Sequence, residues 1–492
     1  MPDSRSTLII GGGPAGLTTA YALASRGVPV TVLEADVQVG GISRTVEHDG
    51  FRFDIGGHRF YTKSEAVNAL WDELLDEGFI TRERISRIYY GRRFYSYPLK
   101  PLEALRQLGL RQAVSCVASY LRAQVAPIPE PATFEEWVSN RFGRRLYEIF
   151  FKTYTEKVWG LRCDQISSDW AAQRIGRLSL ASALWQALPM ASLFGPPAKT
   201  LTQTFRYPYR GPGQLWEACA RKIEALGGRV VLRAHVDACE WRHGEWTVSY
   251  SGADGRREQL TASQLVSSAP MTQLADMLGP ALSEDAREAA GGLRYRDFLT
   301  VCLMFDRPMT FDDQWIYVHE PGVKVGRVQN FGAWSDGMLP SRDTGCLGLE
   351  YFCHEGDGLW SMSDADLIAL GRRELEQIGL WPGGDARTGY VLRQPKAYPV
   401  YDATYATRVE RVWRDIERRL PTLHLVGRNG MHKYNNQDHA MMTGLLTARN
   451  ILAGSRLYDV WRVNADAEYI EDSTIEPSGH ALRAVPMPVT AD

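Results

Sequence analysis

The chain has 492 residues, of which 44% are hydrophobic and 23% charged, and its 58 acidic and 56 basic side chains give a formal charge of −2. This length predicts two or three domains, and the lack of a basic excess argues against a nucleic-acid-binding surface. The seven cysteines form no C-x-x-C spacing, and the apolar runs are too short to cross a membrane. We therefore expect a cytoplasmic globular protein with no metal site and no membrane span.

The first segment of the chain predicts a dinucleotide-binding fold. A short apolar run leads into a G-x-G-x-x-G motif formed by Gly11, Gly13 and Gly16, and residues with helical character follow. In order, the glycines allow a tight turn, close approach of the backbone to a pyrophosphate, and close packing of helix on strand. A second apolar run ends at Glu34, where a carboxylate can accept hydrogen bonds from a ribose. The alternative is a glycine-rich turn in an ordinary α/β domain.

Two further glycine pairs, at 40–41 and 56–57, follow the acidic residue. Glycine lets the backbone pass close to a flat or charged ligand, so Gly41 and Gly57 are candidate cofactor contacts, and Arg44 could reach a phosphate. A domain that binds only NAD does not require these pairs, whereas the pattern resembles FAD-binding proteins of the glutathione-reductase and amine-oxidase type. We therefore expect FAD.

The rest of the chain alternates between helical and strand-like patterns. Helical periodicity prevails up to about residue 204, interrupted by a predicted hairpin at 87–95. Strand-like segments follow, including an apolar run at 265–270 that could rejoin the cofactor sheet, and a final strand at 423–428 precedes a helix at 440–452. We expect a discontinuous FAD-binding domain at 1–64, 205–270 and 420–455, a mostly helical mobile domain at 65–204, an antiparallel sheet domain at 271–419 and a mobile tail at 473–492.

Five segments occur in order along the chain: Gly56-Gly57-His58, the YTEKVWG run at 154–160, FRYP at 205–208 with GPG at 211–213, Trp315-Ile316-Tyr317, and Gly427-Arg428 with KYNNQDH at 433–439. Together they resemble the UDP-galactopyranose mutase family, and the last of them is closest to its eukaryotic branch. The resemblance extends discontinuously from about residue 7 to 453. It implies an α/β protein with a Rossmann-type FAD-binding domain, a helical domain and an antiparallel β-sheet domain.

The resemblance implies a reaction in which the cofactor is the nucleophile. N5 of the reduced flavin attacks the anomeric carbon of a nucleoside-diphosphate sugar and displaces the diphosphate. The sugar opens, recloses through a different hydroxyl and takes the diphosphate back, so that pyranose and furanose interconvert without net redox change. Such a reaction needs cations beside the leaving diphosphate, because negative charge develops there.

The resemblance also implies roles for individual residues. Arg174 and Arg327 look like the two diphosphate-binding arginines of the family, whose guanidinium groups can make bidentate phosphate contacts. His58 would lie against the flavin ring without acting as a base. Taken singly, each arginine is more often a surface or ion-pair residue. Each tyrosine is as often a core-edge aromatic with its hydroxyl in water, and a histidine like His58 is sometimes structural. The remaining implied contacts are Tyr317, Tyr398 and Tyr434 to the phosphates, Trp159 and Trp315 to the substrate, Val236 to adenine through its backbone, and Arg428, Asn436 and Gln437 around the flavin.

The sequence also departs from the family pattern. After Tyr97-Pro98 it has Leu99-Lys100-Pro101 where the family places a large apolar residue and amides, and the loop at 434–437 is short, so the sugar and the base stay open. A second interpretation is a flavin oxidoreductase of the amine-oxidase or desaturase class, and a third is a flavoprotein that binds a nucleotide sugar without rearranging it. No second G-x-G-x-x-G is present, so NAD(P)H as a reductant would share the main cleft.

Overall fold

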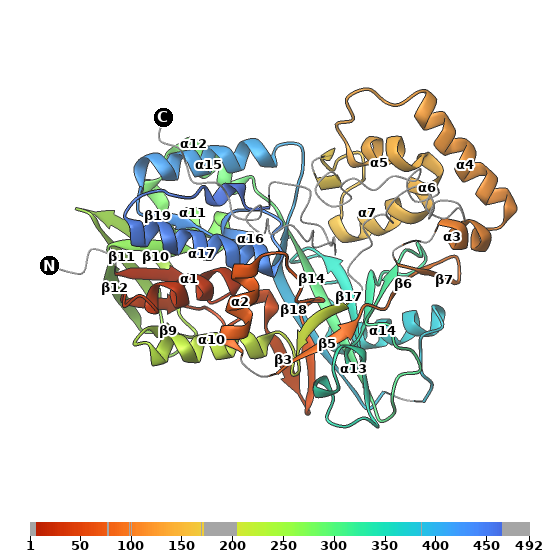
Figure 1. Ribbon diagram of the computed structural model, residues 1–492, viewed down its shortest axis with the longest axis horizontal. Helices are drawn as coiled ribbons and strands as arrows, with labels where there is room; N and C mark the ends of the chain where they lie inside the picture. Colours follow the sequence, from red (N-terminus) through yellow and green to blue (C-terminus); the bar gives the residue numbers. More distant parts are fainter. Residues whose placement is uncertain are drawn as a thin grey trace.

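The computed structural model describes residues 6–75, 78–97, 99, 101–168, 170–171, 204–384 and 386–464. Three regions are visible in Figure 1. One holds a five-stranded sheet with its helices, another a seven-stranded sheet, and the third a group of helices, orange to yellow, beyond one end of the seven-stranded sheet. The predicted α/β fold class is confirmed.

The five-stranded sheet has the order β19-β13-β1-β2-β9, and every neighbouring pair is parallel. Side chains alternate between its faces, as in any strand, so Ile9 faces one cluster of buried apolar residues while Leu8 and Ile10 face another. Both faces are covered, which explains the apolar runs of the sequence. The strands are β1 (Thr7–Ile10), β2 (Val30–Leu33), β9 (Arg229–Val231), β13 (Gln264–Ser267) and β19 (Leu423–Leu425).

Helices cover one face of this sheet, and a small sheet with more helices covers the other. The first layer consists of α1 (Pro14–Ala24), α2 (Glu65–Leu74), α10 (Gly213–Ala225) and α17 (Gln437–Ala453). The second consists of β10 (His235–Arg242), β11 (Glu245–Ser251), β12 (Arg257–Ala262), α11 (Met271–Leu278), α12 (Glu284–Gly291) and α15 (Tyr405–Arg419).

These layers show where the sequence predicted the local structure and where it misplaced the boundaries. The predicted return of the chain at 265–270 to the sheet that contains the first strand is confirmed, since β13 pairs with β1. Helices α11, α12 and α15, however, lie against the five-stranded sheet and not with the sheet at 271–419, because their apolar faces cover that sheet. Helix α2 likewise packs there and not in the helical region.

The seven-stranded sheet has the order β18-β14-β17-β16-β15-β6-β7. Its pairs are antiparallel except β6 with β15, which run parallel, so the sheet is mixed where an antiparallel one was expected. The predicted hairpin at 87–95 forms, but as part of this sheet. The strands are β6 (Ser86–Tyr90), β7 (Arg93–Ser96), β14 (Tyr295–Phe305), β15 (Trp315–Val318), β16 (Arg327–Asn330), β17 (Gly345–Cys353) and β18 (Thr388–Pro399).

Further elements cover the two faces of the seven-stranded sheet. Helix α14 (Asp364–Gln377) packs on one face through Leu367 and Leu375. The other face meets the hairpin β3 (Thr45–His48) and β4 (Phe51–Asp54), the strand pair β5 (Phe79–Glu83) and β8 (Thr204–Pro208), and the short helix α13 (Phe331–Trp334).

The helical region is tied to the seven-stranded sheet by a lysine. Lys157 Nζ, on α7, donates to the carbonyl oxygens of Glu320 (2.6 Å), Val318 (3.3 Å) and Val325 (3.3 Å), which lie in β15 and in the loop that follows it. Within the described ranges, no helix is long and apolar enough to cross a membrane. The helices are α3 (Pro101–Leu108), α4 (Leu110–Val125), α5 (Phe134–Phe142), α6 (Arg144–Tyr147), a π-helical turn (Glu148–Lys152) and α7 (Thr153–Trp159).

Candidate active site

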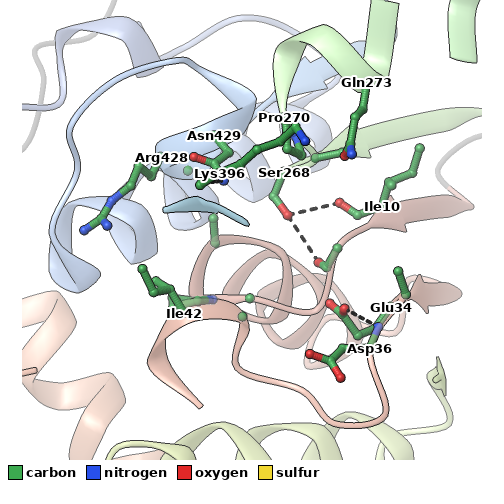
Figure 2. A pocket seen from close by; sticks show the side chains of 18 of the residues that line it. Ile10, Glu34, Asp36, Ile42, Ser268, Pro270, Gln273, Lys396, Arg428 and Asn429 are labelled. Carbon is green, nitrogen blue, oxygen red and sulfur yellow. Dashed lines mark hydrogen bonds between the residues drawn. The ribbon is translucent and has the colours of Figure 1, made fainter. Parts of the chain in front are cut away.

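A cavity of about 930 Å³ runs along the carboxyl edge of the five-stranded sheet. Figure 2 shows Glu34 and Asp36 at one end, Ser268 in the middle and Arg428 at the opposite side. Parallel strands place the following turns at this edge, so segments distant in sequence meet there. The lining includes the predicted cofactor residues Gly11, Gly13, Glu34, Gly41, Arg44, Val236, Arg428, Asn436 and Gln437.

The glycine motif shapes the middle of this cavity. Gly11 has φ +97°, and a Cβ at that position would lie 2.3 Å from Ser268 Oγ. A Cβ at Gly16 would lie 2.0 Å from the carbonyl oxygen of Gly11, so these two glycines are required by packing inside the protein. A Cβ on Gly41 would lie 3.3 Å from the Cα of Gly13, so these two backbones come close together. Helix α1 starts here with no acidic residue in its first turn, and its N–H groups favour an anion.

Glu34 is held in place at the end of β2. Its carboxylate accepts the backbone N–H of Gly12 at 2.5 Å and that of Asp36 at 2.8 Å. Burial raises the pKa of Glu34, and these two hydrogen bonds oppose the rise. A carboxylate has about four acceptor positions, so the protein bonds leave capacity for ribose hydroxyls.

Arg44 lines the cavity, but its charge is already paired. Its Nε lies 3.4 Å from Asp36 Oδ2, and its Nη1 donates to the carbonyl oxygen of Gly41 (2.8 Å) and to Gln394 Oε1 (3.0 Å). Burial lowers the pKa of Arg44, and the carboxylate of Asp36 opposes that shift. Arg44 therefore has two roles: its contacts hold the segment at 40–44 in place, and its side chain lines the cavity.

A second cavity of about 150 Å³ adjoins the first. The two share a wall formed by Ile42, His58, Arg428, Asn436 and Gln437. Four members of this wall, His58, Arg428, Asn436 and Gln437, are residues that the sequence analysis assigned to the flavin. The structure therefore gathers residues from three distant parts of the chain at the junction.

His58 follows the second glycine pair at this junction. Burial, together with the charge of Arg428, lowers the pKa of His58 to about 3, so the imidazole is neutral at physiological pH. A neutral ring suits contact with a ligand better than proton transfer near pH 7. A Cβ on Gly57 would lie 2.5 Å from the Trp315 ring. A glycine is therefore required here for the Trp315 indole to pack, and not only to leave space for a cofactor.

Arg327 enters the second cavity from β16 with an acidic partner. Its Nε lies 2.5 Å from Glu350 Oε2, directly across the sheet on β17, and the Glu350 side chain is fully buried. Its Nη2 donates to the Tyr398 hydroxyl at 3.0 Å. The guanidinium carbon also lies 4.9 Å from the Trp315 ring centroid. Arg327 is thus held rigidly, with its charge balanced by a carboxylate that the sequence prediction did not include.

Arg428 differs from Arg327 in having only neutral partners. Its Nε donates to the carbonyl oxygen of Asn435 (2.9 Å) and its Nη1 to that of Ala397 (3.1 Å). The guanidinium carbon lies 5.3 Å from the Tyr398 ring and 5.1 Å from the Tyr434 ring, which stack on each other at 5.7 Å. No carboxylate oxygen of a described residue lies within 4 Å of it. Its charge is therefore available to an anion at the junction.

The remaining predicted substrate residues divide between the cavity and the layer behind it. Trp315 and Tyr317 line the second cavity from β15 and stack at 5.5 Å. Trp159 does not line it, since its buried ring packs behind Tyr398 and Tyr434 at 6.3 and 6.2 Å. Arg174 lies outside the described residues. The structure therefore brings four of the five predicted aromatic residues to one cavity.

Sequence reasoning missed three charged residues of this cavity region. Arg59 and Arg84 line the second cavity, and Arg59 Nη2 donates to Ser86 Oγ at 2.9 Å. The third is Glu350, the single acidic residue in the otherwise uncharged strand GCLGLEYFC, a pattern that could have indicated a buried ion pair. Among the described residues no group of His, Cys, Asp or Glu side chains could hold a metal ion.

Comparison with known proteins identifies relatives of this arrangement. Residues 14–452 match the family described as flavin containing amine oxidoreductase. The chain is 30% identical over 174 residues to "Probable UDP-galactopyranose mutase" of Klebsiella pneumoniae, a match that covers 33% of this chain and 43% of that protein. It is 42% identical over 72 residues to "Protoporphyrinogen oxidase 2, chloroplastic/mitochondrial" of Arabidopsis thaliana, covering 15% of this chain and 14% of that protein.

A crystal structure of reduced UDP-galactopyranose mutase has the same fold. The TM-score is 0.80 at 21% identity, and the match covers 94% of this chain and 98% of that one. The matched segments of the two curated relatives, in contrast, span less than half of each relative's length. The structural likeness therefore extends over the whole fold, whereas the likeness in sequence is local.

Proposed function

The chain belongs to the flavin-containing amine oxidoreductase family, and from that premise we propose that it is an FAD-dependent nucleotide-sugar mutase. The observation that carries the proposal is the second cavity, where Arg327, Arg428 and the rings of Tyr317, Tyr398 and Tyr434 meet beside the first cavity. Guanidinium groups and tyrosine hydroxyls recognise a diphosphate, and aromatic faces pack against a sugar or a base.

The first cavity fits an extended flavin dinucleotide. Glu34 would accept the ribose hydroxyls, the N-terminus of α1 would face the pyrophosphate, and Arg428 with Gln437 would meet the ring system. Gln437 Nε2 is buried without a hydrogen-bond partner in the protein, and a carbonyl-bearing ring would supply an acceptor. When bound and reduced, FAD would supply the nucleophile for the anomeric carbon.

The protein would act mainly by positioning and neutralising charge. Arg327 cannot move freely because Glu350 and Tyr398 fix it, so its contact with a diphosphate would be preorganised. Its own charge is balanced by Glu350, so Arg428 would contribute most of the uncompensated positive charge among these residues. Arg174 is proposed as the second diphosphate arginine, as the family resemblance implies.

The decisive experiment is anaerobic. The purified protein is reduced with dithionite, UDP-galactopyranose or UDP-galactofuranose is added, and the sugars are separated by chromatography while the flavin spectrum is recorded. Interconversion that requires reduced flavin and leaves it reduced would support the mutase. A UDP-induced spectral change without interconversion would keep the diphosphate site and point to other nucleotide sugars.

The oxidoreductase remains the second candidate, because the aromatic lining of the second cavity and the oxidase relative are both compatible with it. It predicts that an oxidisable substrate bleaches the flavin and is consumed stoichiometrically in the absence of oxygen. It also predicts no response of the flavin spectrum to any nucleoside diphosphate.

The diphosphate contact is tested by titrating UDP into Arg174→Ala, for which we expect a loss of about 1.5–3 kcal/mol in binding free energy, the range for hydrogen bonds to charged groups. Arg242→Ala, which removes an exposed arginine of β10, is the matched control. Equal UDP affinity in Arg174→Ala, the control and the parent protein would remove Arg174 from the site.

A further inference from the structure

Helix α4 carries an apolar stripe that no described residue covers. Five large apolar side chains on it are between 38% and 87% exposed, and they account for five of the twelve exposed large apolar residues that the structure describes. Surface apolar residues are usually scattered singly, so a contiguous row marks an interaction surface. The stripe consists of Leu110, Val114, Val117, Leu121 and Val125.

The stripe lies on the side of α4 that faces away from the protein. Spacings of three and four residues place its five members on one face of the helix. Cys116 is the buried residue of α4, and at about 100° per residue it lies roughly 140° from Leu121 and 160° from Val114. In Figure 1, α4 runs along the outer edge of the helical region, far from the five-stranded sheet. The apolar side chains are therefore not needed for packing within the described protein.

Positive charge accompanies the stripe. Arg111 and Arg122 are both exposed and lie eleven residues apart, about three helical turns, so they follow one border of the apolar face. Between Ala104 and Pro129 the sequence contains three arginines and no acidic residue. A row of apolar residues bordered by arginines is the pattern of a helix that lies in a membrane interface.

The same charges argue against a second copy of the chain as the partner. Antiparallel pairing of two α4 helices through their stripes would bring Arg111 of each copy near Arg122 of the other, and no carboxylate on α4 would offset the repulsion. A surface of anionic headgroups compensates both arginines and accepts the apolar row between its acyl chains.

We propose that α4 docks the protein on an anionic phospholipid surface, with the apolar stripe inserted at the headgroup boundary and Arg111 and Arg122 against the phosphates. The contact would be peripheral and reversible, because a single interfacial helix binds far more weakly than a membrane span. Its strength would fall with added salt, since the arginine contribution is screened.

The test is flotation of the flavin-loaded, full-length protein with two kinds of vesicle, pure phosphatidylcholine and an equal mixture of phosphatidylcholine and phosphatidylglycerol. We expect the protein to float with the mixed vesicles only and to be released by salt. Arg111→Gln with Arg122→Gln should weaken binding about thirtyfold, given the usual contribution of each arginine near an anionic surface. Val114→Gln with Leu121→Gln should weaken it at least about tenfold.

Matched controls separate this surface from general effects. Leu232→Gln and Arg256→Gln alter exposed residues elsewhere and should leave flotation unchanged. The flavin spectrum and melting temperature of each variant show whether it is folded. Failure of the parent protein to float with mixed vesicles would overturn the proposal. So would dimers in sedimentation velocity that are lost in the Val114→Gln and Leu121→Gln variant, because a second copy would then cover the stripe.

Discussion

The two adjoining cavities are built from different parts of the polypeptide. The larger one is shaped chiefly by backbone, with the turn at 11–16 and the segment at 40–44 fixed by glycines and by the start of a helix. The smaller one is shaped by side chains from segments scattered along the whole chain, and these side chains hold one another in pairs, such as Arg327 with Glu350 and Tyr398 with Tyr434.

This difference determines how each cavity responds to substitution. A backbone-built cavity should tolerate changes of its lining side chains but not the addition of a Cβ at a crowded glycine. In a cavity built from paired side chains, the loss of one partner should act mainly by leaving the other partner buried and unpaired. Substitutions at Arg327, Gly16, Asp54 and Tyr398 test this contrast.

Arg327→Met should lower the free energy of unfolding by about 3–5 kcal/mol, because it leaves the fully buried Glu350 without its cation. Chemical denaturation of the flavin-loaded protein measures this loss. Arg327→Met combined with Glu350→Gln should recover most of the stability, since a glutamine can still accept the hydrogen bond from Gln329 Nε2 at 2.7 Å.

The double variant also separates stability from ligand recognition. If Arg327 contacts the diphosphate, the double variant should be stable yet bind UDP weakly. A single variant as stable as the parent protein would show that the pair does not support the second cavity.

Gly16→Ala should lower the free energy of unfolding by about 3 kcal/mol and reduce the flavin content, because the new methyl group would lie 2.0 Å from the carbonyl oxygen of Gly11. Gly291→Ala is the control, since a Cβ there meets no atom within 4 Å. Comparable behaviour of the two alanine variants would contradict the view that backbone crowding shapes the larger cavity.

Asp54→Asn tests a buried carboxyl group at the end of β4, just before the glycine pair at 56–57. Burial raises the pKa of Asp54 to about 7, although Tyr207 and Thr45 donate hydrogen bonds to it. The native state therefore keeps a proton that the unfolded chain releases near pH 4, and the contribution of Asp54 to the free energy of unfolding should fall by about 1.4 kcal/mol per pH unit as the pH rises from 4 to 7.

Urea denaturation across this pH range should show that the stability of the parent protein relative to Asp54→Asn falls with this slope. Asp254→Asn, at an exposed turn, should behave like the parent protein. A parallel pH dependence of parent and Asp54→Asn would mean that Asp54 titrates normally in the native state.

Tyr398→Phe should have the smallest effect, about 1 kcal/mol in the free energy of unfolding, because it removes one neutral acceptor from Arg327 while keeping the stacked ring. Its effect should nearly vanish in the Arg327→Met and Glu350→Gln background, which a double-mutant cycle measures. Full additivity would show that Tyr398 does not help to hold Arg327.

The sequence predicted the larger cavity better than the smaller one for a physical reason. A glycine motif between a strand and a helix specifies its local structure from neighbours in sequence, so the turn at 11–16, Glu34 and the return of β13 could all be anticipated. The positions of Arg327 and the three tyrosines came from family resemblance, since nothing local in the sequence indicates which side chains meet across a sheet.

What the sequence did not predict depends on contacts between distant segments. The parallel pairing of β6 with β15 moves the hairpin at 86–96 into the seven-stranded sheet, and no local pattern specifies it. Helices α11, α12 and α15 have apolar faces that could cover either sheet. Only the folded chain shows that Glu350 faces Arg327 and that Trp159 lies behind the cavity.

The common wall of the two cavities would link the binding of a ligand in one cavity to the binding of a ligand in the other. His58 and Arg428 line both cavities, so a ligand in one cavity would change the electrostatic field and the side-chain packing in the other. Such coupling is reciprocal: if a diphosphate tightens cofactor binding by some factor, the cofactor tightens diphosphate binding by the same factor. By the same reasoning, a diphosphate that prefers the reduced protein must raise the midpoint potential of the flavin, so the resting redox state would report whether substrate is bound.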